Sequence, residues 1–96
     1  MTHPTSAEPD PQARLRRLRL RAWRRGTKEM DLILGPWADA HLAGLSAGDL
    51  ERFEALMEEN DQDLYAWITG QMPAPQAHAT LLDTIGVHAR DRLRPR

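Results

Sequence analysis

Apolar residues recur every three or four positions along most of this chain, and no other feature of the sequence constrains its fold as strongly. Residues with that spacing share one face of an α-helix, which can then be buried against other helices. No stretch shows the two-residue alternation that is typical of a half-buried strand. At 96 residues the chain has room for a single hydrophobic core. The sequence therefore predicts an all-α fold, a small single-domain bundle of about five helices with disordered termini.

Glycine and proline residues predict where the first two helices begin and end. The first helix is expected to begin near Pro11 and to end at Gly26. The second is expected over residues 28–43. Inside it we expect a kink or a break at Gly35-Pro36, because proline lacks an amide hydrogen and clashes with the preceding turn.

Three further helices are expected after this point. Ser46 would cap the third, and a turn at residues 60–63 would precede a short fourth helix that ends at Gly70. The fifth is expected over residues 76–89. The predicted organisation is a disordered N-terminal segment at residues 1–12, a helical bundle at 13–89 and a frayed basic tail at 90–96.

The apolar faces of these helices predict the core. Its expected members are Leu15, Leu18, Ala22, Met30, Ile33, Leu34, Trp37, Leu42, Leu50, Phe53, Leu56, Met57, Leu64, Trp67, Ile68, Leu81, Leu82 and Ile85. His41 falls on the apolar face of the second helix, so we expect a core or boundary histidine there. Trp23 follows the arginines of the first helix and fits either the core or an exposed position.

Charged residues are segregated along the chain. Residues 14–28 contain eight basic side chains and no acidic one, whereas residues 31–83 contain ten acidic side chains and one basic side chain, Arg52. Two arrangements fit this pattern. Either the molecule is an electric dipole that orients a charged partner, or the two regions neutralise each other within the fold.

No group of residues has the pattern of a catalytic, metal or nucleotide site. The chain has no cysteine, its histidines lack metal-ligand spacing, and its six glycines are too scattered for a phosphate-binding loop. We therefore expect neither an enzyme nor a bound metal or cofactor. The start of the chain lacks a targeting signal, and no apolar stretch approaches the roughly 20 residues that span a bilayer. We expect a cytoplasmic protein without membrane insertion, monomeric when free.

One short motif stands out at the expected corner between the first two helices, Arg25-Gly26-Thr27-Lys28-Glu29, followed by Met30-Asp31. It resembles the R-G-x-x-E signature of the FAD assembly factors of succinate dehydrogenase, which are the bacterial SdhE proteins and mitochondrial assembly factor 2. Further matches follow in the family's order: Leu45-Ser46, Asp49-Leu50, Phe53-Glu54, Asp61-x-Asp63-Leu64, Trp67 and Gly70. The resemblance covers Leu18 to Ile85, with a departure at Gln62, where relatives frequently have proline.

The resemblance implies a five-helix, chaperone-like factor. Such a factor binds the flavoprotein subunit of succinate dehydrogenase, and often of fumarate reductase, and promotes covalent attachment of FAD to a histidine of that subunit. The flavoprotein is thought to catalyse the attachment itself, so the factor would act by positioning. Arg25, Gly26 and Glu29 match the motif that faces the flavoprotein in relatives, and Asp31 lies beside it. These four are the candidate partner-binding residues.

Physical chemistry gives the motif positions distinct roles. Gly26 permits a left-handed backbone and close approach of a partner. Arg25 offers a planar fork of donors, and Glu29 is in the first turn of a helix, where the dipole favours an anion. The alternative is that Arg25 and Glu29 only pair with each other, four residues apart.

Two other functions remain open at this point. The first is a nucleic-acid-binding or antitoxin-type small helical protein, because an arginine-rich helix can contact phosphates. The acidic region argues against it, since it would repel a polyanion unless it faced away. The second is a helical interaction protein with an unrelated client.

Overall fold

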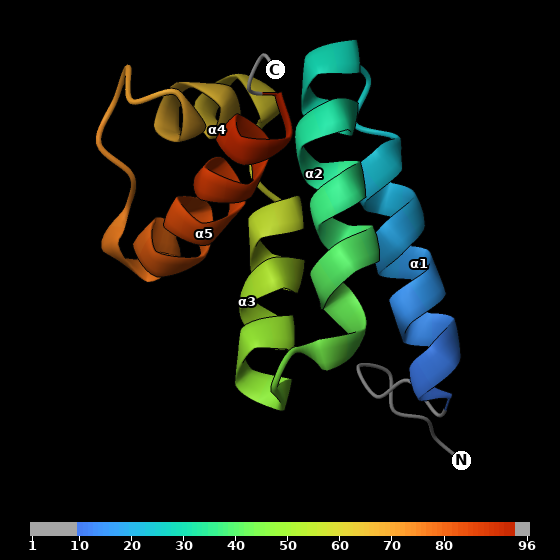
Figure 1. The fold of residues 1–96 in the computed structure, drawn as a ribbon. Coiled ribbons are helices and arrows are strands. Elements are labelled where there is room, and N and C mark those ends of the chain that lie inside the picture. The colour runs from blue at the N-terminus through green and yellow to red at the C-terminus, as the bar shows by residue number, and fades with distance from the viewer. Residues whose placement is uncertain (1–9, 94–96) are drawn as a thin grey trace.

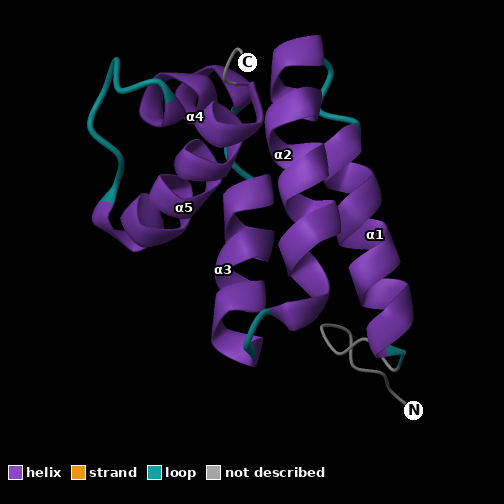
Figure 2. Cartoon of the chain, viewed as in Figure 1, coloured by secondary structure: helices purple, strands orange, loops and turns teal. Residues whose placement is uncertain are grey.

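The computed structural model describes residues 10–93, which form five α-helices and one short 3-10 helix, η1 (Figures 1 and 2). In chain order these are α1 (Pro11–Trp23), α2 (Lys28–His41), η1 (Leu42–Gly44), α3 (Ala47–Met57), α4 (Asp61–Ile68) and α5 (Gln76–Leu93). The prediction of an all-α bundle of about five helices is confirmed. The termini that we expected to be disordered lie, at residues 1–9 and 94–96, outside the described residues.

Capping residues begin these helices as the sequence predicts. The Ser46 hydroxyl accepts a hydrogen bond of 3.1 Å from the amide of Asp49 at the start of α3. The Asn60 side chain does the same for the amide of Gln62 at the start of α4, at 2.8 Å. Each such cap stabilises a helix by about 1 kcal/mol. Local residue chemistry is therefore enough to place these two helix starts.

Two helix ends differ from the expectation. The second helix ends at His41 and continues as the tighter η1, rather than reaching residue 43 as one α-helix. The fifth runs to Leu93, four residues beyond the expected end at Ala89. Arg90 and Arg92 lie in its last turn, where cationic side chains favour the negative end of the helix dipole. Residues 90–93, placed in the expected tail, therefore belong to α5, and residues 11 and 12 belong to α1.

Pro36 lies inside α2, so that of the kink or break expected at Gly35-Pro36 the break does not occur. Proline has no amide hydrogen to donate to the carbonyl four residues earlier, which is that of Leu32. Arg92 of α5 supplies a donor instead, because its Nη1 atom lies 3.2 Å from the Leu32 oxygen. A contact from a distant helix thus replaces the hydrogen bond that proline removes.

The core lies where α1, α2, α3 and α5 meet. Helices α1 and α2 run antiparallel, α3 lies beside them, and α4 and α5 pack across one side of this trio (Figure 1). Most of the predicted core residues are buried, and Leu15, Leu50, Trp67 and Ile68 are partly buried against them. His41 is a correction, because its side chain is exposed. It is the last residue of α2, and its ring stacks on Trp37 at 5.2 Å between ring centroids rather than entering the core.

Ion pairs to the acidic residues neutralise much of the arginine-rich helix. Arg14 donates from Nε to Glu54 at 3.0 Å, and Arg21 pairs with Glu58 at 2.9 Å. Glu54 is on α3 and Glu58 is the C-cap of that helix, so both pairs connect α1 with α3. The structure therefore favours the second of the two arrangements of charge, in which the basic and acidic regions offset each other within the fold.

The pair between Arg14 and Glu54 predicts a specific acid sensitivity. The hydrogen bond from Arg14 holds the pKa of Glu54 below its ordinary value of 4.5. Because the folded pKa is the lower one, the pair stabilises the fold above about pH 4.5 and that contribution is lost as pH falls further. Glu54→Gln should therefore reduce the difference in unfolding free energy between pH 7 and pH 3.5, measured by urea denaturation. Glu51→Gln, at an exposed position of the same helix, is the control and should leave that difference unchanged.

Gly35 and Trp23 predict a steric effect at the interface between α1 and α2. The Trp23 ring lies against Gly35, so that a Cβ atom added there would stand 2.3 Å from Trp23 Cδ2. Gly35→Ala should lower the unfolding free energy by about 1–3 kcal/mol, because the indole ring has to move. Denaturation followed by tryptophan fluorescence measures this cost. Gly44→Ala is the matched control, since a Cβ at Gly44 meets no atom within 4 Å; equal stability of the two variants would contradict the prediction.

Trp23 itself is half-exposed. Its side chain is 37% accessible, and its Nε1 donates to Asp39 Oδ2 at 3.2 Å. The ring therefore covers Gly35 with one face while its edge reaches solvent.

Candidate partner-docking site

The motif forms the corner between α1 and α2. Helix α1 ends at Trp23, α2 begins at Lys28, and the chain reverses between them. Gly26 has a φ of +107°, and a Cβ atom there would meet no other atom within 4 Å. The glycine is therefore required by the backbone conformation, not by lack of space. Thr27 then caps α2 by accepting from the amide of Met30 at 3.3 Å.

The side chain of Arg25 points into the protein and is 10% exposed. Its Nη1 donates to the Met57 carbonyl at 2.8 Å, and its Nη2 donates to the Glu59 carbonyl at 3.0 Å. The Met57 carbonyl is at the C-terminal end of α3, where helix carbonyls lack partners within the helix, and the Glu59 carbonyl is in the turn that follows. Nε donates to Asp61 Oδ1 at 2.8 Å, in the first turn of α4. Arg25 thereby joins the corner to the junction of α3 and α4.

Asp31 holds the backbone of the same motif. Its Oδ1 accepts a hydrogen bond of 2.6 Å from the amide of Arg25. A carboxylate that accepts from a backbone amide makes a charge-assisted bond, which is stronger than a neutral one. Arg25 and Asp31 thus immobilise the corner from opposite sides, one through its side chain and one through the main chain.

Glu29 differs from both, because its side chain is exposed in the first turn of α2. Within residues 10–93 its carboxylate makes no ion pair or hydrogen bond, and the alternative pairing of Arg25 with Glu29 is not formed. The positive end of the helix dipole favours a carboxylate at this place. Glu29 is an anionic group held on a rigid corner and open to a partner.

An apolar groove lies next to Glu29, between α2, α4 and α5. Its volume is about 850 Å³, and its lining includes Glu29 together with Leu32, Tyr65 and Val87. These three apolar side chains are 37%, 39% and 44% exposed. Clustered exposed apolar residues mark interaction surfaces on soluble proteins. The prediction from sequence missed this groove, because its residues come from three helices; the only local signal was an apolar residue on the polar face of each helix.

The corner and the groove together combine the exposed carboxylate of Glu29, the turn at Gly26 and a hollow whose lining is mostly apolar but also includes Arg90 and Asp91. Charged groups at the edge of an exposed apolar surface are typical of contacts between proteins. Among residues 10–93, no three histidine, aspartate or glutamate side chains are placed to hold a metal ion. Within the same range, no helix has both the length and the apolar character that crossing a membrane requires.

Comparison with known proteins gives one consistent family. A sequence model described as "Flavinator of succinate dehydrogenase" matches residues 16–89, which include the whole motif. The FAD assembly factor SdhE of Acetobacter pasteurianus is 38% identical over 74 residues, or 77% of this chain and 68% of that protein. SdhE of Aliivibrio fischeri is 34% identical over 74 residues, or 76% of this chain and 86% of that protein. Mitochondrial succinate dehydrogenase assembly factor 2 of Mycosarcoma maydis is 33% identical over 75 residues, which cover 78% of this chain and 32% of that protein.

Proposed function

Since the chain belongs to the family of flavinators of succinate dehydrogenase, we propose that it binds the flavoprotein subunit of succinate dehydrogenase and promotes covalent attachment of FAD to that subunit. It would act as a chaperone-like assembly factor and not as an enzyme. The family resemblance also implies the flavoprotein subunit of fumarate reductase as a partner, and the proposal includes it. Action in the cytoplasm as a free monomer belongs to the same proposal.

The observation that carries the proposal is the state of Glu29. Most acidic residues around the corner are engaged inside the chain: Asp31 with the Arg25 amide, Asp61 with the Arg25 guanidinium, and Glu58 with Arg21. Glu29 is exposed, without such a contact in the described part of the chain, and beside an apolar groove. An exposed charge next to apolar surface supports a contact that is oriented by the charge and stabilised by burial.

The four candidate residues then have two kinds of role. Glu29 would contact the flavoprotein directly, and Gly26 would let its backbone approach the corner closely. Arg25 and Asp31 would act as positioning residues, because their polar atoms hold the corner and the junction of α3 and α4 together. The proposal keeps all four residues predicted from the sequence: two would contact the flavoprotein and two would hold the corner in place.

The proposed mechanism is positional. Docking would stabilise the conformation of the flavoprotein in which the acceptor histidine and the flavin ring are held at reacting distance, which lowers a barrier without adding a chemical group. A preformed corner suits this role, because a rigid surface loses little conformational freedom on binding. No acid, base or nucleophile from this chain is required.

Covalent flavin in the large subunit of succinate dehydrogenase is the decisive readout. Cells that lack this chain should show little flavin fluorescence in that subunit after denaturing gel electrophoresis, and expression of the chain should restore it. A pull-down with the tagged chain should recover the flavoprotein subunit. Full flavin fluorescence without the chain would contradict the proposed function, even if the two proteins associate.

The ion pairs bear on the nucleic-acid alternative. A helix that binds phosphates needs arginines with free guanidinium groups. Arg14 and Arg21 are paired with Glu54 and Glu58. Arg19 lies 3.5 Å from Asp39, and Arg25 is nearly buried. These internal contacts favour the protein partner over the polyanion.

A further inference from the structure

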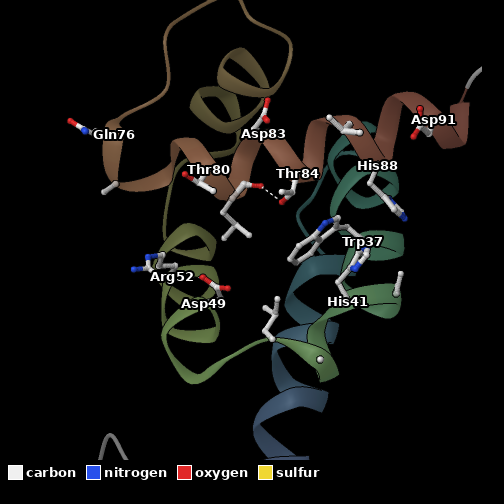
Figure 3. A pocket seen from close by; sticks show the side chains of 16 residues that line it. Trp37, His41, Asp49, Arg52, Gln76, Thr80, Asp83, Thr84, His88 and Asp91 are labelled. Carbon is white, nitrogen blue, oxygen red and sulfur yellow. Dashed lines mark hydrogen bonds and ion pairs between the residues drawn. The ribbon is translucent and has the colours of Figure 1, made fainter.

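A second and larger hollow lies between α2, α3 and α5, away from the motif corner (Figure 3). Its volume is about 1150 Å³. Pockets for small ligands and cofactors measure roughly 300–1,000 Å³ and enclose most of the ligand. This hollow is larger than that, and its lining side chains come from α2, α3 and α5 (Figure 3). Its size suits a peptide segment better than a compact small molecule.

The floor of this hollow, which we name the α3–α5 groove, is apolar. Trp37 from α2, Leu45 after η1 and Leu81 from α5 line it. Trp37 and Leu81 belong to the buried core, and Leu45 packs against that core. Trp37 and Leu81 are only 3% and 8% exposed, so the accessible apolar surface comes from Leu45 and from Val87, which also lines the hollow and is 44% exposed. Burial of an apolar side chain against these two residues would contribute about 25 cal/mol for each Å² of apolar surface.

The rim of the α3–α5 groove is acidic. Three aspartates line it, Asp49, Asp83 and Asp91, against a single basic residue, Arg52. Arg52 is already paired with Asp49, three residues earlier on α3, at 2.9 Å. Asp83 is exposed and makes no ion pair within residues 10–93. Of these carboxylates, Asp83 is the one that the rim offers to a cation of a bound segment.

Two histidines, His41 and His88, line one end of the α3–α5 groove. Burial lowers the pKa of His88, and the nearby His41 and Arg92 lower it further, against the opposite effect of Asp91. The rings of His41 and His88 meet edge to face at 5.3 Å between centroids. The imidazole of His88 therefore lines the groove as a neutral ring.

We propose that the α3–α5 groove binds a cationic, partly apolar peptide segment of a protein partner. The exposed carboxylate of Asp83 selects a lysine or arginine side chain, and Leu45 and Val87 contact the apolar side chains beside it. A second copy of this chain fits less well. Its own run of arginines extends over α1 and the corner that follows it, and Arg14, Arg19, Arg21 and Arg25 of that run are paired with carboxylates of the same chain.

The test uses the full-length chain and a display library of random dodecapeptides. Selected peptides should combine lysine or arginine with apolar residues, and a labelled peptide should shift the amide resonances of Thr80 and Thr84, which line the α3–α5 groove. Asp83→Lys reverses one rim charge and should weaken binding of that peptide at least roughly tenfold in fluorescence anisotropy. Asp63→Lys, an exposed position on α4 that does not line this groove, makes the same change in net charge and should alter binding less than about twofold.

Three outcomes would overturn the proposal. Selected peptides without basic residues would exclude charge selection by the rim. Equal weakening by Asp83→Lys and Asp63→Lys would show attraction to the net charge alone. Self-association of the chain that Asp83→Lys abolishes would assign the groove to a second copy. Circular dichroism of both variants checks that each is folded, so a loss of binding reports the groove and not the fold.

Discussion

Glu29→Ala should lower covalent flavin in the large subunit of succinate dehydrogenase at least roughly tenfold while the chain stays folded. A residue at the centre of a protein contact commonly contributes 2 kcal/mol or more to binding, which is about thirtyfold in affinity. The loss to the fold is much smaller. Glu29 has no internal partner among residues 10–93, so only its favourable interaction with the α2 dipole is removed, at about 0.3–1 kcal/mol. In-gel flavin fluorescence measures the first effect and urea denaturation the second.

Two further variants define what Glu29 contributes. Glu51→Ala removes another exposed carboxylate, on α3 and outside both grooves, and should leave flavin attachment unchanged. Glu29→Gln keeps the size and removes the charge, so a loss equal to that of alanine would assign the effect to the carboxylate. Normal flavin attachment with Glu29→Ala would exclude the corner as the contact. Whether the chain as a whole is required for flavin attachment is tested separately, by the cells that lack it.

Arg25→Ala should destabilise the fold itself, by about 3 kcal/mol. The substitution removes a guanidinium that is 10% exposed and leaves the carbonyls of Met57 and Glu59 and the carboxylate of Asp61 without their donor. Breaking a buried charged contact by removing one partner costs about 3–5 kcal/mol, and the estimate is lower here because Asp61 is 22% exposed. Equilibrium denaturation in urea measures the difference.

Matched variants protect this prediction if Arg25→Ala fails to fold. Arg25→Lys keeps the charge but not the planar fork of donors, so it should cost less than alanine and still more than about 1 kcal/mol. Arg24→Ala removes the neighbouring arginine, which is exposed, and should change stability by under about 0.5 kcal/mol. If Arg25→Ala is as stable as Arg24→Ala, the guanidinium does not hold the corner.

Together these variants separate two roles inside one motif. Glu29 substitutions should reduce flavin attachment at unchanged stability, and Arg25 substitutions should reduce both in parallel. A third pattern, in which Arg25→Lys is stable but inactive, would mean that Arg25 contacts the partner directly and not through the corner.

Much of the fold was predictable from short stretches of sequence. Ser46 caps α3 at the expected place, Gly26 adopts a left-handed backbone at the expected corner, and Leu34 and Phe53 are buried as their spacing indicates. Each of these outcomes depends on residues within about one helical turn of each other, where backbone geometry and side-chain chemistry decide the result.

Two local expectations were not met as stated. Of the kink or break expected at Gly35-Pro36, no break occurs, and the carbonyl that proline leaves without a backbone donor accepts a hydrogen bond from Arg92. His41 is exposed at the end of α2, although its spacing places it on the apolar face of that helix. The residues that these two contact, Arg92 and His88, lie on α5, so no local spacing in the sequence indicates the contacts.

The sequence by itself determined the helices, their caps, the buried faces and, through its resemblance, the motif on the corner between α1 and α2. Only the tertiary structure decided which charged side chains of that motif have partners within the chain. The donors of Arg25 are used by residues 32 to 36 positions away, whereas Glu29 is left open beside a groove that three helices build. The physical reason is one of range. Secondary structure follows from interactions between neighbours in the chain, but a free carboxylate, an apolar hollow or an acidic rim exists only once packed helices have fixed the distances between residues that the sequence keeps apart.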